Sequence, residues 1–188
     1  MKHCSSRSAV LGLSALIALA GVTVPATQVL SQTGVSRQQQ NFVYASDDST
    51  RLNVPVRWQV QRDLNPEANL QVADLRSEEY LIVITESKAQ FPQWTFRDHS
   101  DATLDLLLNN LGVEASISPP SKLTIGGRQA VQYEIRTEIQ GLPIVYLHTT
   151  VDGQNNYHQL LAWTLESRFS FNQSVLQGAI ASFEEVSP

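Results

Sequence analysis

Residues 128 to 165 contain three strand-like runs separated by two turn signals, and no other feature restricts the possible folds as strongly. From Val131 to Ile135, apolar residues alternate with polar ones, which is the period of a half-buried strand. The turn signals are Gln-Gly-Leu-Pro at 140–143 and Asp-Gly-Gln-Asn-Asn at 152–156, and an Asp-Gly pair between such runs is a strong hairpin signal. The pattern predicts an antiparallel meander with strands over about 128–139, 144–151 and 157–165.

The rest of the folded region shows a similar order of strands followed by a helix. Four further strand patterns are present, at 42–45, 56–61, 70–75 and 80–86. Leucines at helical spacing predict a helix over 101–111, with Ser100 as its cap and Gly112 as its stop, and a second helix is predicted over 172–183. Two groups of strands, each followed by a helix, predict an α+β fold in which a mainly antiparallel β-sheet is flanked by helices.

The first 41 residues have the composition of a targeting segment and a linker. Lys2 and Arg7 precede an apolar run from Ala9 to Val24, and small residues follow, so we expect a signal peptide over 1–26. The alternative is a retained membrane anchor, for which the run is short compared with the ~20 residues of a span. We expect no transmembrane span in the mature chain. The glutamine-rich stretch 27–41 predicts a flexible linker before a single domain over 42–188.

Charge and cysteine content narrow the function classes. The chain has a net charge of -5 and no basic run, so nucleic acid is not an expected partner. Cys4 is the only cysteine and would be removed with the signal peptide, which leaves the mature domain without thiol chemistry. At 42% hydrophobic and 16% charged residues, the chain has enough apolar residues to fold around a core.

Three stretches of the chain are similar to a known family in their kind and order. They are RLNVPVRWQV at 51–60, GGRQAVQYEI at 126–135 and NYHQLLAWTLESRFSFNQSVLQGAIASF at 156–183. They resemble the strand–proline–tryptophan entry, the glycine turn with its strand, and the closing strand and helix of the PsbP/DcrB-like family of small extracytoplasmic α/β/α sandwich proteins. These are packing motifs, so Pro55 and Trp58 are interpreted as a strand entrance and a core anchor.

The resemblance also implies a function. It implies an exported accessory or binding protein without catalytic activity, located in the periplasm, or in the thylakoid lumen if the host is photosynthetic. The expected partner is a protein, and a membrane-associated complex such as a photosystem fits the family. The sequence contains no nucleophile elbow, phosphate loop or His-Glu-x-x-His motif, so a hydrolase is the weaker alternative.

A metal site is a second functional alternative. If Val151 lies opposite Tyr157, then His148 and His158 become diagonal neighbours on one sheet face, with Cβ atoms within ~7 Å. Two imidazoles at that spacing suit zinc or copper, although no third ligand is identified. The competing interpretation is that both are ordinary polar residues beneath a helix. A shift of one residue in the pairing would separate the two histidines onto opposite faces.

The loop between the fourth strand and the first helix is rich in aromatic residues. Phe91, Trp94 and Phe96 lie within six residues, and such side chains either cap a core or form a partner surface. We expect at least two of them to face the core and Trp94, beside Arg97, to make any partner contact. His99 is interpreted as part of the helix N-terminus, with a metal site or a pH-sensitive contact as the alternative.

Overall fold

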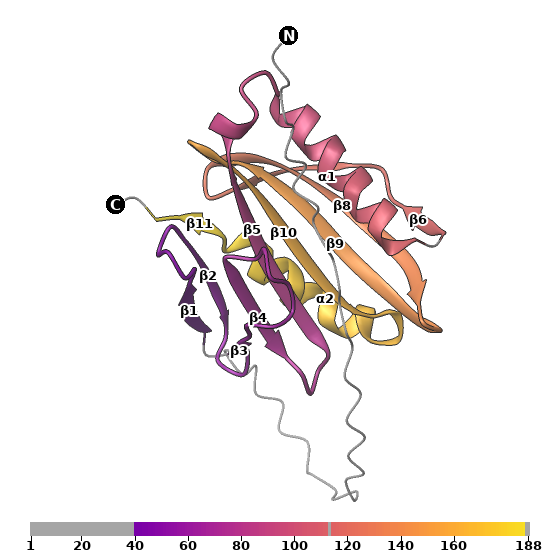
Figure 1. The fold of residues 1–188 in the computed structure, drawn as a ribbon. Helices are drawn as coiled ribbons and strands as arrows, with labels where there is room; N and C mark the ends of the chain where they lie inside the picture. The colour runs from indigo at the N-terminus through magenta and orange to yellow at the C-terminus, as the bar shows by residue number, and fades with distance from the viewer. Residues whose placement is uncertain (1–39, 113, 187–188) are drawn as a thin grey trace, which may run out of the picture.

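The computed structural model describes residues 40–112 and 114–186. The predicted signal peptide, with Cys4, lies outside the described residues, as does the predicted linker up to residue 39. The described chain folds into one layered body with both helices packed against strands (Figure 1). In the described part, no helix is long and apolar enough to span a membrane.

Strands make up most of the described elements. They are β1 (Gln40–Tyr44), β2 (Thr50–Pro55), β3 (Gln59–Val60), β4 (Leu70–Asp74), β5 (Glu79–Ser87), β6 (Ala115–Ile117), β7 (Ser121–Ile125), β8 (Arg128–Ile139), β9 (Leu142–Asp152), β10 (Asn156–Leu165) and β11 (Glu184–Glu185). The helices are the short 3-10 helix η1 (Lys88–Gln90), α1 (Phe96–Leu111) and α2 (Glu166–Ala181).

The strands form two antiparallel sheets. The large sheet has the order β3-β4-β5-β10-β9-β8-β6, with β7 also paired to β8, and the small sheet has the order β1-β2-β11. Every pairing in both sheets is antiparallel. The predicted α+β fold, with a mainly antiparallel sheet flanked by helices, is therefore confirmed.

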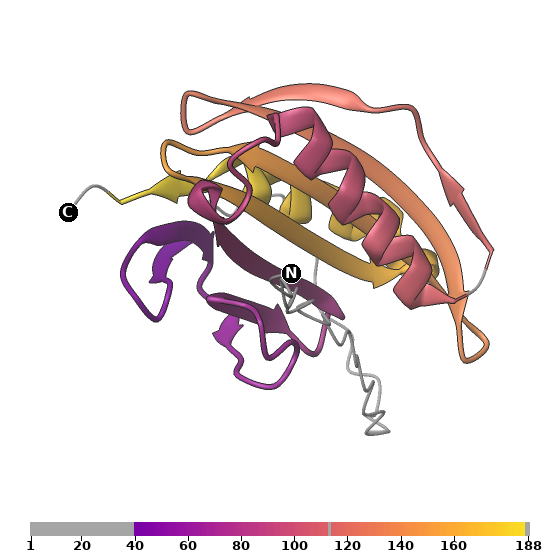
Figure 2. The same cartoon turned by 45° about the horizontal axis from the view of Figure 1, so that its top comes forward.

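The two helices cover opposite faces of the large sheet (Figures 1 and 2). On one face, α1 places Leu104, Leu107, Leu108 and Leu111 against Tyr146 and its apolar neighbours. On the other face, α2 and the small sheet enclose the larger core, which includes Leu52, Leu147, Leu160, Leu176 and Phe183. Both faces of the central strands are consequently buried.

Trp58 is a core residue, as predicted. Its side chain is 3% exposed, and its indole N–H donates to Glu79 at 2.7 Å. Arg57 forms ion pairs with the same carboxylate and with Asp74. Pro55 is the last residue of β2 and not the entrance of a strand, and the predicted strand over 56–61 is reduced to β3, so both of these predictions are wrong.

Several predicted element boundaries are wrong. The strand β1 begins at Gln40, so the last two residues of the predicted 27–41 linker belong to a strand. Helix α1 begins five residues early, because Thr95 caps it through a capping box with Asp98 and Ser100 is buried inside it. Helix α2 begins at Glu166 in place of 172, and strands β6 and β7, on either side of Pro119 and Pro120, are not predicted from the sequence.

Candidate partner-binding corner

The aromatic loop forms a corner of the molecule where β5 passes through η1 into α1. We call residues 87–99 the aromatic corner. Ser87 caps η1, and Thr95 caps α1 through reciprocal bonds with Asp98. The Tyr157 hydroxyl, from β10, donates to the carbonyl oxygen of Trp94 at 3.1 Å. These caps and the tyrosine bond hold the backbone of the loop at both ends.

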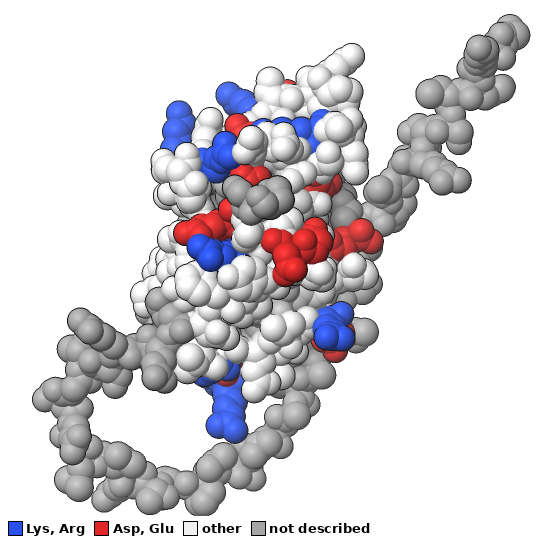
Figure 3. All heavy atoms as spheres, turned by 90° about the vertical axis from the view of Figure 1, so that its left-hand side faces the viewer, with Lys and Arg blue, Asp and Glu red and all other residues white. Residues whose placement is uncertain are grey.

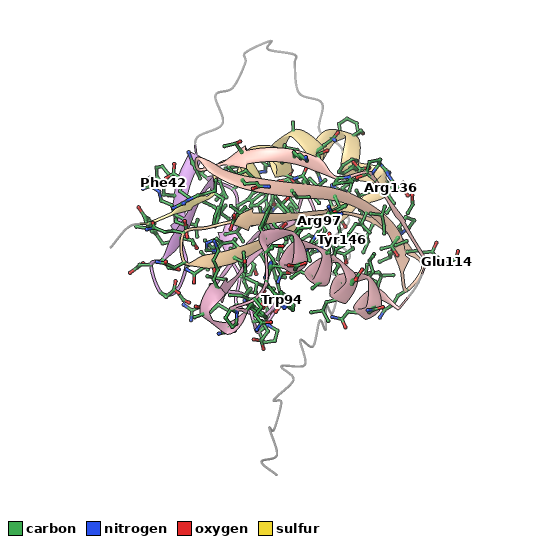
Figure 4. All side chains as sticks on the ribbon, turned by 90° about the horizontal axis from the view of Figure 1, so that it is seen from above. Phe42, Trp94, Arg97, Glu114, Arg136 and Tyr146 are labelled. Carbon is green, nitrogen blue, oxygen red and sulfur yellow. The ribbon has the colours of Figure 1, made fainter. Side chains whose placement is uncertain are left out.

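Trp94 is exposed within this rigid setting. Its side chain is 42% exposed, and its ring contacts Phe91 at a centroid distance of 4.7 Å. Phe91 and Phe96 are half-buried. The prediction that Trp94 is the aromatic residue available to a partner agrees with its exposure, and Figure 4 shows it beyond the N-terminal end of α1.

Beneath the tryptophan lies a buried histidine–carboxylate pair. The ring of His99 is fully buried, stacks on Tyr157 at 4.3 Å and faces Trp94 at 6.4 Å. Its Nε2 atom lies 2.9 Å from a carboxylate oxygen of Glu86, which also accepts a bond from Gln159. Burial alone would raise the pKa of Glu86, but these hydrogen bonds outweigh it and lower the pKa. The carboxylate therefore stays charged and holds the ring in place.

Arg97 lies on the outer side of α1. Its side chain is 89% exposed, and its one ion pair among the described residues is with Asp101 at 3.5 Å, one helical turn away. A pair this exposed holds the guanidinium weakly. Trp94 and Arg97 thus project from the same end of α1 as an accessible aromatic ring and an accessible cation.

The predicted pairing of the two metal-ligand candidates is wrong by one residue. His158 pairs with Val151, and His148 pairs with Leu161, so the two rings point to opposite faces of the large sheet. The prediction relied on one apolar face per strand. Helices bury both faces of the large sheet, so apolar residues can point to either face of each strand. The apolar pattern of the sequence therefore does not decide the pairing register. The His148–His158 site is withdrawn, and no cluster of three ligand-type side chains is present among residues 40–112 and 114–186.

His158 belongs instead to a second buried histidine–carboxylate pair. Its Nε2 atom lies 3.1 Å from Glu185 in the C-terminal strand, and its Nδ1 atom lies 3.1 Å from the hydroxyl of Thr85. Burial lowers the pKa of His158 despite the neighbouring carboxylate. For Glu185, burial favours a higher pKa, but the bonds from His158 and the backbone N–H of Gln154 lower it.

His148 lies on the α1 face and has no such partner. Neither ring nitrogen has a hydrogen bond of ordinary geometry among the described residues; Gln159 on the same face lies near the ring and opposes the fall of the His148 pKa, while its amide donates to Glu86. Burial lowers the pKa of His148 from 6.5 to about 4. This histidine is therefore a neutral core residue at physiological pH.

Sequence reasoning missed the two carboxylates that complete these pairs. Glu86 is 13 residues from His99, and Glu185 is 27 residues from His158. Both contacts are created by tertiary packing, so no local sequence motif indicates them. The burial of His99 had a weak signal, because His99 lies about two helical turns before the buried Leu107.

Comparison with solved structures supports the fold. The chain is similar to cyanobacterial PsbP (CyanoP) from Synechocystis sp. PCC 6803, with a TM-score of 0.60, 17% identity, and coverage of 84% of this chain and 99% of that one. It is also similar to LpqN, a Mycobacterium tuberculosis protein involved in cell envelope biogenesis, with a TM-score of 0.55, 17% identity, and coverage of 79% and 91%. No family model and no curated protein matches the chain. The predicted PsbP-like architecture is confirmed at the level of fold.

Proposed function

We propose that the chain is an exported, non-catalytic accessory protein that binds a protein partner through the aromatic corner. The observation that carries this proposal is the exposure of Trp94 on a backbone held at both ends. Tryptophan and arginine are the residues most enriched at energetically important positions of protein interfaces. A ring that is already fixed loses little entropy on binding, which favours affinity.

The location and the kind of partner follow from the family resemblance and not from the site. The signal-peptide pattern at 1–26 and the PsbP-like fold support an extracytoplasmic location, in the periplasm or, in a photosynthetic host, the thylakoid lumen. A membrane-associated complex such as a photosystem is then the proposed partner. The similarity to LpqN, which is involved in cell envelope biogenesis, supports the same kind of location.

The burial of the histidines supports a non-catalytic role. His99, His148 and His158 are each at most 1% exposed, so none of their rings can reach a group on a dissolved substrate without a change in structure. The two histidine–carboxylate pairs instead join distant elements. One links α1 to β5, and the other links β10 to β11.

The proposal can be tested by cross-linking in intact cells of the native host. A C-terminally tagged chain is cross-linked and purified after detergent extraction, as wild type, Trp94→Ala and Phe171→Ala. Phe171 is the matched control, because it is 82% exposed on α2, far from the aromatic corner in the fold. Loss of one reproducible membrane-complex band in Trp94→Ala alone supports the proposal. Recovery of the same band from both variants, or of free chain in every case, contradicts it.

A further inference from the structure

The two sheets have four open sides, and three of them carry features that prevent strand addition. The outermost strands β3 and β11 are each only two residues long. On the side formed by β6 and β7, Pro119 and Pro120 interrupt the edge and Lys122 adds a charge. Short edges, prolines and lysines are the usual ways in which natural proteins block pairing with other chains.

The fourth side, strand β1, has none of these features. Its sequence, QNFVY, spans five residues without a charge or a proline, and Phe42 and Tyr44 are 49% and 46% exposed. Strand β1 pairs with β2 on one side only. Natural proteins usually protect a free strand edge against pairing with other chains. A free edge without such protection and with exposed aromatic side chains therefore indicates a binding role.

The register shows which backbone groups of β1 are free to pair. Ala45 donates to Thr50 at 2.9 Å, and hydrogen-bonded pairs alternate in an antiparallel ladder, so Val43 also bonds to β2. Phe42 and Tyr44 then direct their N–H and C=O groups away from β2. The position of Pro55 agrees, because it lies opposite Gln40, at a non-bonded position where its missing N–H costs nothing.

A groove of about 600 Å³ lies beside the C-terminal end of β1. Val43 and Tyr44 of β1 and the following Ser46 line one wall, and residues between Val60 and Gln71 line the other. Ser46 closes one end by donating to the carbonyl oxygen of Asn69 at 3.0 Å. The surface on this side of the molecule is largely uncharged between a few acidic and basic side chains (Figure 3).

We infer that β1 is a strand-addition site, at which an extended segment of another polypeptide pairs with Phe42 and Tyr44. This edge is separate from the aromatic corner, since Figure 4 shows Phe42 and Trp94 well apart. The inference therefore does not depend on the proposed function.

Charge and shape define the chemistry of the segment. Arg62 is the one charged residue that lines the groove, and it has no ion pair among the described residues, so it favours an acidic side chain or a terminal carboxylate. Alternate residues of an added strand point to opposite faces. One set would meet Val43 and Leu70, and the other would lie beside the rings of Phe42 and Tyr44. The expected segment alternates apolar residues and carries a negative charge at one end.

A peptide selection tests the site directly, because it does not require the identity of the partner. A displayed library of random octapeptides is selected on the protein in the form that its host makes. Enriched peptides are measured by calorimetry on the wild type and three variants, Phe42→Pro, Phe42→Val and Arg62→Glu. Phe42→Pro removes the outward N–H at a position that β2 does not use, and Phe42→Val is its matched control because it removes the ring and keeps the N–H. Thermal unfolding checks that each variant is folded.

The enriched peptides should have apolar residues at alternate positions and an acidic residue or carboxylate at one end. Their binding should slow hydrogen exchange at the amides of Phe42 and Tyr44. Affinity should fall at least tenfold in Phe42→Pro and much less in Phe42→Val, and Arg62→Glu should weaken the binding of peptides with an acidic end. The inference is overturned if no peptide is enriched or if Phe42→Pro binds as well as Phe42→Val. It is also overturned if light scattering shows a dimer, or if residues before Gln40 already protect these two amides in the free protein.

Discussion

At the scale of single residues, His148 is a costly side chain to bury. Its two ring nitrogens lack partners among the described residues, and the charged form is excluded by burial, which lowers its pKa from 6.5 to about 4. In the unfolded chain the same ring binds a proton near its ordinary pKa. As pH falls below about 6.5, the unfolded state gains protons that the folded state does not, so stability decreases until the pH reaches about 4.

The resulting prediction concerns the pH dependence of unfolding. This one histidine should remove about 3 kcal/mol of unfolding free energy between pH 7 and pH 4. His158 should add a loss of the same sign, because burial lowers its pKa too. His148→Leu should unfold in urea with a weaker dependence on pH, because the substitution removes the group whose pKa differs between the folded and unfolded states. An unchanged pH dependence in His148→Leu would show that the ring is accessible to protons in the folded state.

The residues that bear on function differ in how well the sequence predicts them. Trp58 and Trp94 are assigned correctly as buried and exposed, because a strand pattern surrounds the first and a loop surrounds the second. The partners of His99 and His158 are not predicted, because each lies on another element. Local patterns indicate exposure, but pairing between distant residues depends on the register.

At the scale of elements, the two-residue strand β11 fastens the C-terminus to the rest of the fold. Glu185 accepts bonds from the backbone N–H of Gln154 and from buried His158, and it pairs with Arg128. Its neighbour Glu184 pairs with Arg51 in a more exposed position. The strand is thus held mainly through one carboxylate.

Glu185→Ala should therefore destabilise the protein by about 1–3 kcal/mol, since it leaves the buried ring of His158 without its carboxylate partner. Glu184→Ala, the matched control on the same strand, should change little because surface ion pairs contribute little. The measurement is chemical unfolding at pH 7, with hydrogen exchange at Val186, whose amide bonds to Ser49. Equal effects from both substitutions would mean that the strand is not fastened by Glu185.

Two glycines should respond in opposite ways to alanine substitution. A Cβ atom on Gly153 would lie 2.5 Å from a Glu185 oxygen and 2.6 Å from Nε2 of His158, so Gly153→Ala should destabilise the protein. Gly178 lies within α2 with open space around it, and Gly178→Ala should stabilise the protein by roughly 0.5–1 kcal/mol through lower backbone entropy. Melting temperatures that shift in the same direction would contradict the packing described at the β9–β10 turn.

The elements show where prediction from sequence succeeds and fails. The β8–β9–β10 meander and the stop of α1 at Gly112 are predicted, because turn residues and left-handed glycines have strong local preferences. The start of α1 is missed because both Thr95 and Ser100 are good caps, and only the reciprocal bond with Asp98 distinguishes them. Strands β6 and β7 are missed because a Pro-Pro pair separates two short runs.

At the scale of the whole molecule, both faces of the large sheet are buried. This burial explains both the predicted fold class and the wrong register predicted between β9 and β10. The β8–β9–β10 meander and the α+β class follow from alternation and hairpin signals, which do not depend on the register. The relative position of His148 and His158 does not follow from the sequence, because a shift of one residue in the register exchanges the two sheet faces. The position of the small sheet over α2 is likewise a product of packing between distant segments.

The central claim, that the aromatic corner binds a partner, is tested most directly by a photo-cross-linking amino acid placed at single positions in living cells of the native host. The probe replaces Trp94 in one strain and Phe171 in another, since both positions are exposed and lie on different elements. We predict one defined cross-linked partner from position 94 and none from position 171. Cross-links from position 171 to the same partner, or none from position 94, would contradict the account.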